Sequence, residues 1–209
     1  MLKVKDILDT ARNDLQDSGK VRWGDDDLLI GFNEGRRELV RLIPSANPVT
    51  TVLQFVAGTR QTITGSELLN VICNMGADKA TPGRVIISIP QTVLESARPD
   101  LHTAAASGEA KYSSLIVGDK KAFLVFPPQP AVSPGSAKIV QSEPPIDTLI
   151  ANIATEGIGV DDSYEAVLVA YTLYKAYSMD AEAGNFDRAT GQLAIFHNKL
   201  GVSDVVQGR

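Results

Sequence analysis

The chain has 209 residues, enough for one domain or for one domain that carries a second as an insertion. It is 44% hydrophobic and 22% charged, close to the average of soluble globular proteins. Its net charge of −5 does not favour binding to DNA or to an anionic membrane. A single cysteine, Cys73, excludes an internal disulfide and a multi-cysteine zinc site. The sequence begins without a signal-peptide pattern and has no run near the ~18 apolar residues of a membrane span, so we expect a soluble intracellular protein.

Two amphipathic helices are predicted at the start of the chain. In residues 3–17, apolar residues recur at three- and four-residue steps, and Gly19 ends the pattern. In "VRWGDDDLLIGFNEGRRELVRLIP", residues 21–44, a second apolar face runs as far as Pro44, which stops the helix. Trp23, just before this helix, is expected to staple its start to the core.

The three consecutive aspartates in this stretch allow two interpretations. Asp25 stands where an N-cap belongs, and Asp26 and Asp27 would meet the free N–H groups and the positive dipole end of the first turn. A magnesium or calcium site is the alternative, but it needs further converging ligands that the sequence does not supply. Capping by Asp25 is the favoured interpretation.

The pattern changes between residues 48 and 145. Short segments rich in β-branched residues are bounded by Gly, Pro or polar clusters, and they predict six or seven strands. They are "TTVLQFVAG", "TRQTIT", "LLNVICNM", "GRVIISIP", "SSLIVG", "KAFLVFPP" and "SAKIVQSEPP". Residues 90–112 begin with a helical turn and become small and polar, as in a functional or mobile segment or one that a neighbouring subunit covers.

Helix returns after Asp161. The first segment, residues 161–184, carries tyrosines at helical spacing, which we interpret as core rather than as a base-stacking surface. Asn185 is expected to cap the second segment, whose apolar residues follow 3-4-3-4 steps and predict a narrow packing seam. The tyrosines are Tyr164, Tyr171, Tyr174 and Tyr177, and the seam is Phe186, Ala189, Leu193, Phe196 and Leu200.

The economical architecture is an α+β fold, a helical bundle built from the N- and C-terminal helices with an inserted β-rich domain of sandwich or barrel type. The predicted ranges are 1–47 for the N-terminal helices, 48–145 for the inserted domain, 146–200 for the C-terminal helices and 201–209 for a tail.

Enzyme signatures are scarce. The sequence has no G-x-S-x-G elbow, no G-x-x-x-x-G-K-[ST] loop and no H-E-x-x-H pair. His197, beside Phe196, is expected to be partly exposed, and no nucleophile is spaced to use His102. Cys73 lies in an apolar run and is expected to be a buried small hydrophobe. The sequence therefore predicts no catalytic, cofactor-binding or metal-binding residue.

Arg36, Arg37 and Arg41 are most simply a solvated face that pairs with nearby glutamates, and a contact with an acidic protein partner is the alternative. Two classes of function remain open from the residues alone. One is a structural or interaction protein whose β insertion and tail contact neighbours. The other is a binding module or enzyme whose site assembles from scattered loops.

The stretch "VRWGDDDLLIGFNEGRRELVRLIPSA" resembles the second-helix motif of the head-to-tail adaptor proteins of tailed bacteriophages, especially those of short-tailed phages. Four further segments follow in the order expected of that family, so the resemblance covers nearly the whole chain. One departure is Leu101, where the family leads us to expect tryptophan. The four segments are "NMGADKATPGRVI", "ARPDLH", "LVFPPQP" and "AYSMDAEAGNFDRATGQLAIFHNKLG".

The resemblance implies a non-enzymatic structural protein of the virion neck, made in the host bacterial cytoplasm and without a cofactor. Its partners would be the portal protein, the tail nozzle and copies of itself in a ring, typically twelve-fold. DNA would pass through the lumen only as cargo, and no membrane would be bound. Another neck or tail-completion protein, or a loop-assembled binding module, is the alternative.

Residues 201–209, "GVSDVVQGR", are the candidate portal contact. Val202, Val205 and Val206 are its only apolar residues, and no helical period continues, so the segment gains little by packing on its own monomer. In a groove of the portal the valines would bury area and Arg209 would pair with an acid. In the family that the chain resembles, the C-terminal end commonly reaches toward the portal. We expect a largely monomeric free protein that forms rings on the portal.

Overall fold

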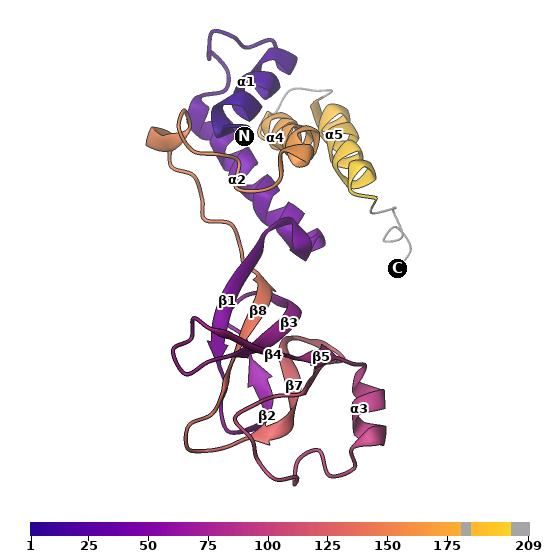
Figure 1. Cartoon of the computed structure of the whole chain (residues 1–209). Helices are drawn as coiled ribbons and strands as arrows, with labels where there is room; N and C mark the ends of the chain where they lie inside the picture. Colours follow the sequence, from indigo (N-terminus) through magenta and orange to yellow (C-terminus); the bar gives the residue numbers. More distant parts are fainter. Residues whose placement is uncertain (181–184, 202–209) are drawn as a thin grey trace. The chain divides into compact units, whose positions relative to one another are not determined.

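The computed structural model describes residues 1–180 and 185–201 (Figure 1). The chain divides into two compact units, a helical unit of Met1–Leu42 with Pro145–Arg209 and a β unit of Ile43–Pro144. The described residues form five α-helices and two four-stranded sheets, so the predicted α+β class is confirmed. Within the described ranges, no helix is long and apolar enough to cross a membrane.

The first helix, α1 (Val4–Asp14), buries the apolar face that the sequence predicted, but it ends well before Gly19. Gln16 adopts a left-handed conformation with φ of 55°, and the N–H groups of Gln16 and Asp17 bond back to carbonyls in the last turn of α1. This is the Schellman type of helix end, made here without glycine.

Helix α4 (Glu165–Ser178) packs against α1, α2 (Asp25–Leu42) and α5 (Asn185–Lys199). Two glycines of α2 bring its backbone close to α4. A Cβ added at Gly31 or Gly35 would lie 3.1 Å from side-chain atoms of α4, tighter than ordinary contact. A short 3-10 turn, η3 (Asp162–Tyr164), leads into α4, and the carboxylate of Asp161 accepts a hydrogen bond from the Ser163 N–H at 2.9 Å.

The four tyrosines predicted as core, with hydroxyls that can reach solvent, lie at the rim of the core, so this prediction holds only in part. All four are half-buried, and the buried face of α4 consists of apolar residues and Thr172. The atoms nearest Gly31 and Gly35 of α2 belong to Lys175, Thr172 and Tyr171. A tyrosine suits such a rim because its ring is apolar and its hydroxyl is polar. The buried residues include Val167, Leu168, Ala170, Leu173 and Ala176.

The β unit contains two four-stranded sheets. The first has the order β1 (Pro48–Gln54), β8 (Ser136–Ser142), β3 (Glu67–Met75), β4 (Pro82–Val85), and the second has the order β2 (Gly58–Thr62), β7 (Asp119–Gln129), β6 (Tyr112–Ile116), β5 (Ile87–Ser88). Neighbouring strands are antiparallel except β5 and β6, which are parallel. Side chains from both sheets share one apolar core that includes Leu68, Val71, Phe123, Val125 and Ile139.

The prediction of six or seven strands was one too few, because residues 83–90 belong to both sheets. The segment pairs first with β3 as β4 and then with β6 as β5, and the buried Ile86 lies between the two strands. Hydropathy alone cannot mark this change of sheet, since the apolar run continues through it. Cys73 on β3 is buried and free, as predicted.

The weakly patterned residues 90–112 are anchored within the β unit. They begin with α3 (Gln91–Ala97), and a second apolar cluster joins Leu94 and Leu101 to Leu124 and Phe126 of β7. Leu101, where the resemblance led us to expect tryptophan, is therefore a core residue.

Candidate functional site

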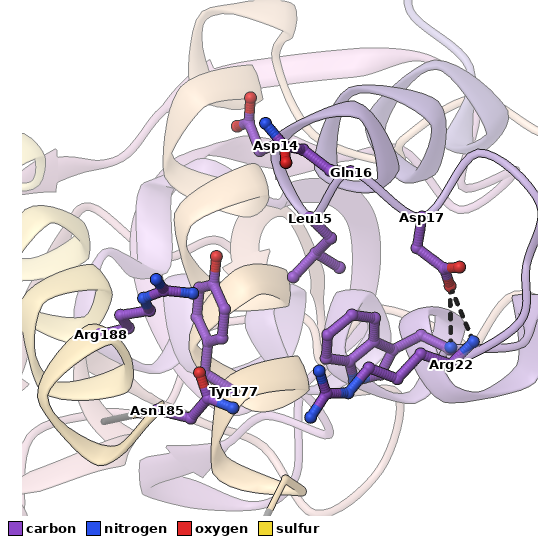
Figure 2. A pocket seen from close by; sticks show the side chains of 9 residues that line it. Asp14, Leu15, Gln16, Asp17, Arg22, Tyr177, Asn185 and Arg188 are labelled. Atoms are coloured by element: carbon purple, nitrogen blue, oxygen red, sulfur yellow. Dashed lines mark hydrogen bonds between the residues drawn. The ribbon is translucent and has the colours of Figure 1, made fainter. Parts of the chain in front are cut away.

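The turn between α1 and α2 closes around the carboxylate of Asp17. Its Oδ1 accepts the N–H of Val21 at 2.9 Å, and its Oδ2 accepts those of Arg22 at 3.2 Å and Trp23 at 2.9 Å. Figure 2 shows the two bonds to Oδ2. These bonds, the one from Trp23 foremost, hold the pKa of Asp17 below its usual value although burial opposes them.

The buried guanidinium of Arg12 completes the same turn. Its Nη1 donates to the Trp23 carbonyl at 2.9 Å, and its Nη2 donates to Asp25 Oδ1 at 2.7 Å. Lys20 binds the other oxygen of Asp25 at 2.5 Å. Lys20 and, to a smaller extent, Arg12 lower the pKa of Asp25. A charged group inside the protein needs such a partner, because losing water is expensive.

Asp25 is therefore not the N-cap that the sequence predicted. The helix begins at Asp25 itself, the Gly24 carbonyl accepts the N–H of Leu28, and Asp27 Oδ2 accepts the N–H of Gly24 at 2.9 Å. The helix start was predicted correctly, but the capping carboxylate is Asp27. Asp25 is instead recruited by Arg12, which lies thirteen positions earlier and on another helix.

Trp23 staples the start of α2 to the core, as predicted. Its indole Nε1 donates to the Ala176 carbonyl of α4 at 3.2 Å, the residue is 7% exposed, and the guanidinium of Arg22 lies 4.9 Å from the ring centre. The aspartate and tryptophan motif is thus a structural junction of α1, α2 and α4.

A polar cleft of about 460 Å³ opens beside this junction (Figure 2). Tyr177, Asn185 and Arg188 line one side, and residues of the α1–α2 turn line the other. No group of three His, Cys, Asp or Glu side chains in residues 1–180 and 185–201 is placed to hold a metal ion.

Arg36 was predicted to lie on a solvated face, but it is 2% exposed. Its Nη2 donates to Asn33 Oδ1 at 2.8 Å, to the Ile146 carbonyl at 2.7 Å and to Thr148 Oγ1 at 3.1 Å. Burial lowers the pKa of its guanidinium. The prediction was wrong because helical periodicity shows only which face of α2 Arg36 occupies. The segment after β8 covers that face and supplies acceptors for the guanidinium.

The other two arginines of α2 are exposed, as predicted. Arg37 pairs with Asp147, and Arg41 pairs with Glu38 at 2.5 Å. Such exposed pairs contribute little to stability.

Several large apolar side chains are exposed on the helical unit, among them Val21 in the α1–α2 turn, Phe186 of α5 and a group that follows β8. Phe186 of α5, predicted to belong to the packing seam, is 80% exposed, which corrects that prediction, although Ala189 and Phe196 of the seam are buried. Ile146, Leu149 and Ile150, which follow β8, are 88%, 65% and 46% exposed. Apolar side chains mark a binding surface where they are contiguous, whereas singly exposed ones are common on soluble proteins.

The candidate portal-binding residues Val202, Val205, Val206 and Arg209 lie outside the described residues. Asn185, the predicted cap of α5, is the buried first residue of that helix, and the residues before it lie outside the described ranges. His102 is exposed, and its Nδ1 lies 2.7 Å from the Thr59 hydroxyl. His197 is half-buried, as predicted, and its ring contacts Phe196.

The buried roles of Arg12, Asp17 and Arg36 were not predicted. For Arg12 and Asp17 the sequence signal is their position at a helix end and in a connecting turn, where unpaired backbone groups need partners. Arg36 lies in the interior of α2, and no local signal marks it.

A family profile described as SU10 adaptor protein matches residues 2–209. This match confirms the resemblance to a phage head-to-tail adaptor family. No curated protein matches the chain.

Proposed function

The chain belongs to the SU10 adaptor protein family, and on that premise we propose that it forms a ring that joins the portal to the tail nozzle of a phage particle. The family match over residues 2–209 carries the proposal. The role is structural rather than enzymatic, and DNA passes through the ring, twelve-fold in this proposal, only as cargo. The protein is made in the host bacterial cytoplasm and becomes part of the virion neck.

In this proposal the helical unit is the bundle of the adaptor and the β unit is its insertion. The order of the units along the chain supports this, because Ile43–Pro144 interrupts the two parts of the helical unit. The apolar side chains exposed on the helical unit make few contacts within the monomer, so they are available to bind neighbouring subunits or other proteins.

The portal contact is proposed for the C-terminal residues Val202, Val205, Val206 and Arg209. Three valines and a terminal arginine suit an apolar groove with an acidic neighbour. The same portal protein would then organise adaptor molecules that are largely monomeric when free.

The test mixes the full-length protein with portal rings from the same phage and images the product by electron microscopy. We expect ring-on-ring complexes for the wild type. A variant that lacks residues 202–209 should keep its melting temperature and lose portal binding, and exposed Val117→Ser in the β unit serves as the control that keeps both.

Absence of any ring on the portal with wild-type protein would contradict the adaptor function. If the truncated variant instead occupies portal rings as fully as the wild type, the adaptor function is retained, and the portal-binding surface lies on the helices or the β unit.

A further inference from the structure

A groove lies between α4 and α5, the orange and yellow helices that run side by side in Figure 1. It has a volume of about 520 Å³, and Phe186, which is 80% exposed, lies on its wall. An aromatic ring this exposed gains almost nothing from its own monomer. We call this surface the α4–α5 groove; its lining is Tyr174, Tyr177, Ser178, Asp180, Phe186, Ala189, Thr190 and Leu193.

A second exposed apolar group projects from the segment that follows β8. We call Ile146, Leu149 and Ile150 the apolar knob. Its backbone is held in place, because the Ile146 carbonyl accepts a bond from Arg36 and the Thr148 N–H donates to Asn33 Oδ1 at 3.0 Å. The knob is therefore presented on a fixed support, which lowers the entropy that binding must overcome.

The stretch of the helical unit that carries the knob is acidic. No lysine or arginine occurs between Lys138 and Lys175, and within the helical unit this stretch carries the acids Asp147, which pairs with Arg37, Glu156, Asp161, Asp162 and Glu165. The one carboxylate on the groove lining, Asp180, is paired with Arg22. Beside the groove, Arg188 stacks at 5.9 Å from the ring centre of Tyr177 and forms no ion pair with a described carboxylate. An acidic apolar segment would satisfy both the groove and Arg188.

We infer that the apolar knob of one copy binds in the α4–α5 groove of the next copy. Each copy carries both surfaces, and the two differ, so the contact is head-to-tail. Such contacts close into a ring when the rotation between copies allows it. The inference rests on the proposed ring and adds which surfaces join its subunits.

Cross-linking tests this contact. Full-length Leu149→Cys and Phe186→Cys proteins are mixed, either on portal rings or free at high concentration, and treated with a short bis-maleimide. We expect cross-linked dimers in the mixture, few with either variant alone, and a ladder of larger species when one chain carries both substitutions. The control pairs Phe186→Cys with Val117→Cys, another exposed position, and should give few dimers. The native Cys73 is buried and contributes little.

Failure of the 149–186 cross-link in rings that have assembled on the portal would overturn the inference and leave the adaptor function intact. Cross-linking in the free protein without any portal decoration would support the inference and contradict the adaptor function. Cross-linking of Phe186→Cys to Val205→Cys within one chain, in place of Leu149→Cys, would assign the groove to the chain's own tail and also overturn the inference.

Substitution provides a second measurement. Leu149→Ser and Phe186→Ser should each reduce ring occupancy on the portal at least tenfold at limiting protein, with melting temperatures unchanged because both side chains are exposed. Wild-type occupancy for both variants would overturn the inference.

Discussion

The helical unit and the β unit bury polar groups of different kinds. Among the described residues, the buried charged side chains are Arg12, Asp17 and Arg36, and all three belong to the helical unit. The buried polar residues of the β unit are neutral, and Gln61 illustrates them, since its amide bonds to the N–H and carbonyl of Val56. Within the described ranges, buried charge thus occurs only in the helical unit, which also buries neutral side chains such as Asn33, whereas the β unit buries neutral ones alone.

The reason lies in where backbone groups lack partners. Strands satisfy one another across a sheet, and in the β unit neutral side chains such as Gln61 and Asn74 serve backbone groups that the ladders leave over. Helix ends and the turns between helices leave several N–H and C=O groups unpaired, and one charged side chain can serve several of them at once. Asp17 accepts three N–H groups, and Arg36 donates to carbonyls from two places in the segment after β8. The helical unit should therefore respond to charge and pH, and the β unit to apolar packing.

The largest expected effect is in the β unit. Phe123→Ala removes a fully buried ring from the shared core and should lower the free energy of unfolding by about 3–5 kcal/mol. Hydrogen exchange in β3, β7 and β8 should accelerate, whereas the unfolding midpoint followed by Trp23 fluorescence, the single tryptophan of the chain, should hold. An equal fall of the Trp23 midpoint would break the comparison, because the chain would then unfold as one cooperative body.

The second prediction concerns the helical unit. Arg36→Ala leaves buried carbonyls without a donor and should lower the free energy of unfolding by about 2–4 kcal/mol. Its neighbour provides the control, because Arg37 is exposed and Arg37→Ala should change stability by less than about 1 kcal/mol. Urea unfolding followed by Trp23 fluorescence measures both variants. Equal losses for the two would show that the buried network contributes nothing special.

The third prediction is a loss of stability in acid. The folded-state pKa of Asp17 lies below its ordinary value of 3.8, so its contribution is fully present above that value and is lost as the pH falls through the folded pKa. Urea midpoints followed by Trp23 fluorescence should hold from neutral pH to about pH 5 and fall as the pH is lowered further toward the folded pKa of Asp17. Asp17→Asn, less stable at neutral pH, should lose less on acidification. The same acid loss in both proteins would exclude Asp17 as its source.

The smallest effect separates the aspartates at the start of α2. Asp27→Ala removes the carboxylate that accepts the Gly24 N–H and should lower the free energy of unfolding by about 0.5–1 kcal/mol. Asp26 is exposed, and Asp26→Ala should be close to neutral. Thermal unfolding by circular dichroism compares the two, and a larger loss for Asp26→Ala would reassign the cap.

The sequence by itself determined the class of fold, most helices and strands, and the family. These follow from local patterns, because apolar periodicity, glycine and proline positions and the order of the segments are visible without contacts. It also placed Trp23 and Cys73 inside, because their chemistry favours burial in almost any context.

Only the tertiary structure decided which charges are buried and which apolar residues are exposed. The sequence predicted Asp25 as a helix cap, but in the structure its carboxylate binds Arg12 of another helix. The sequence predicted Arg36 as solvated, but the segment after β8 covers it. Phe186 continued a packing seam by its spacing, yet no described part of the chain covers it. Each outcome depends on a partner far away in the sequence. A local pattern shows which face of a helix a residue occupies, but not what the fold brings to that face.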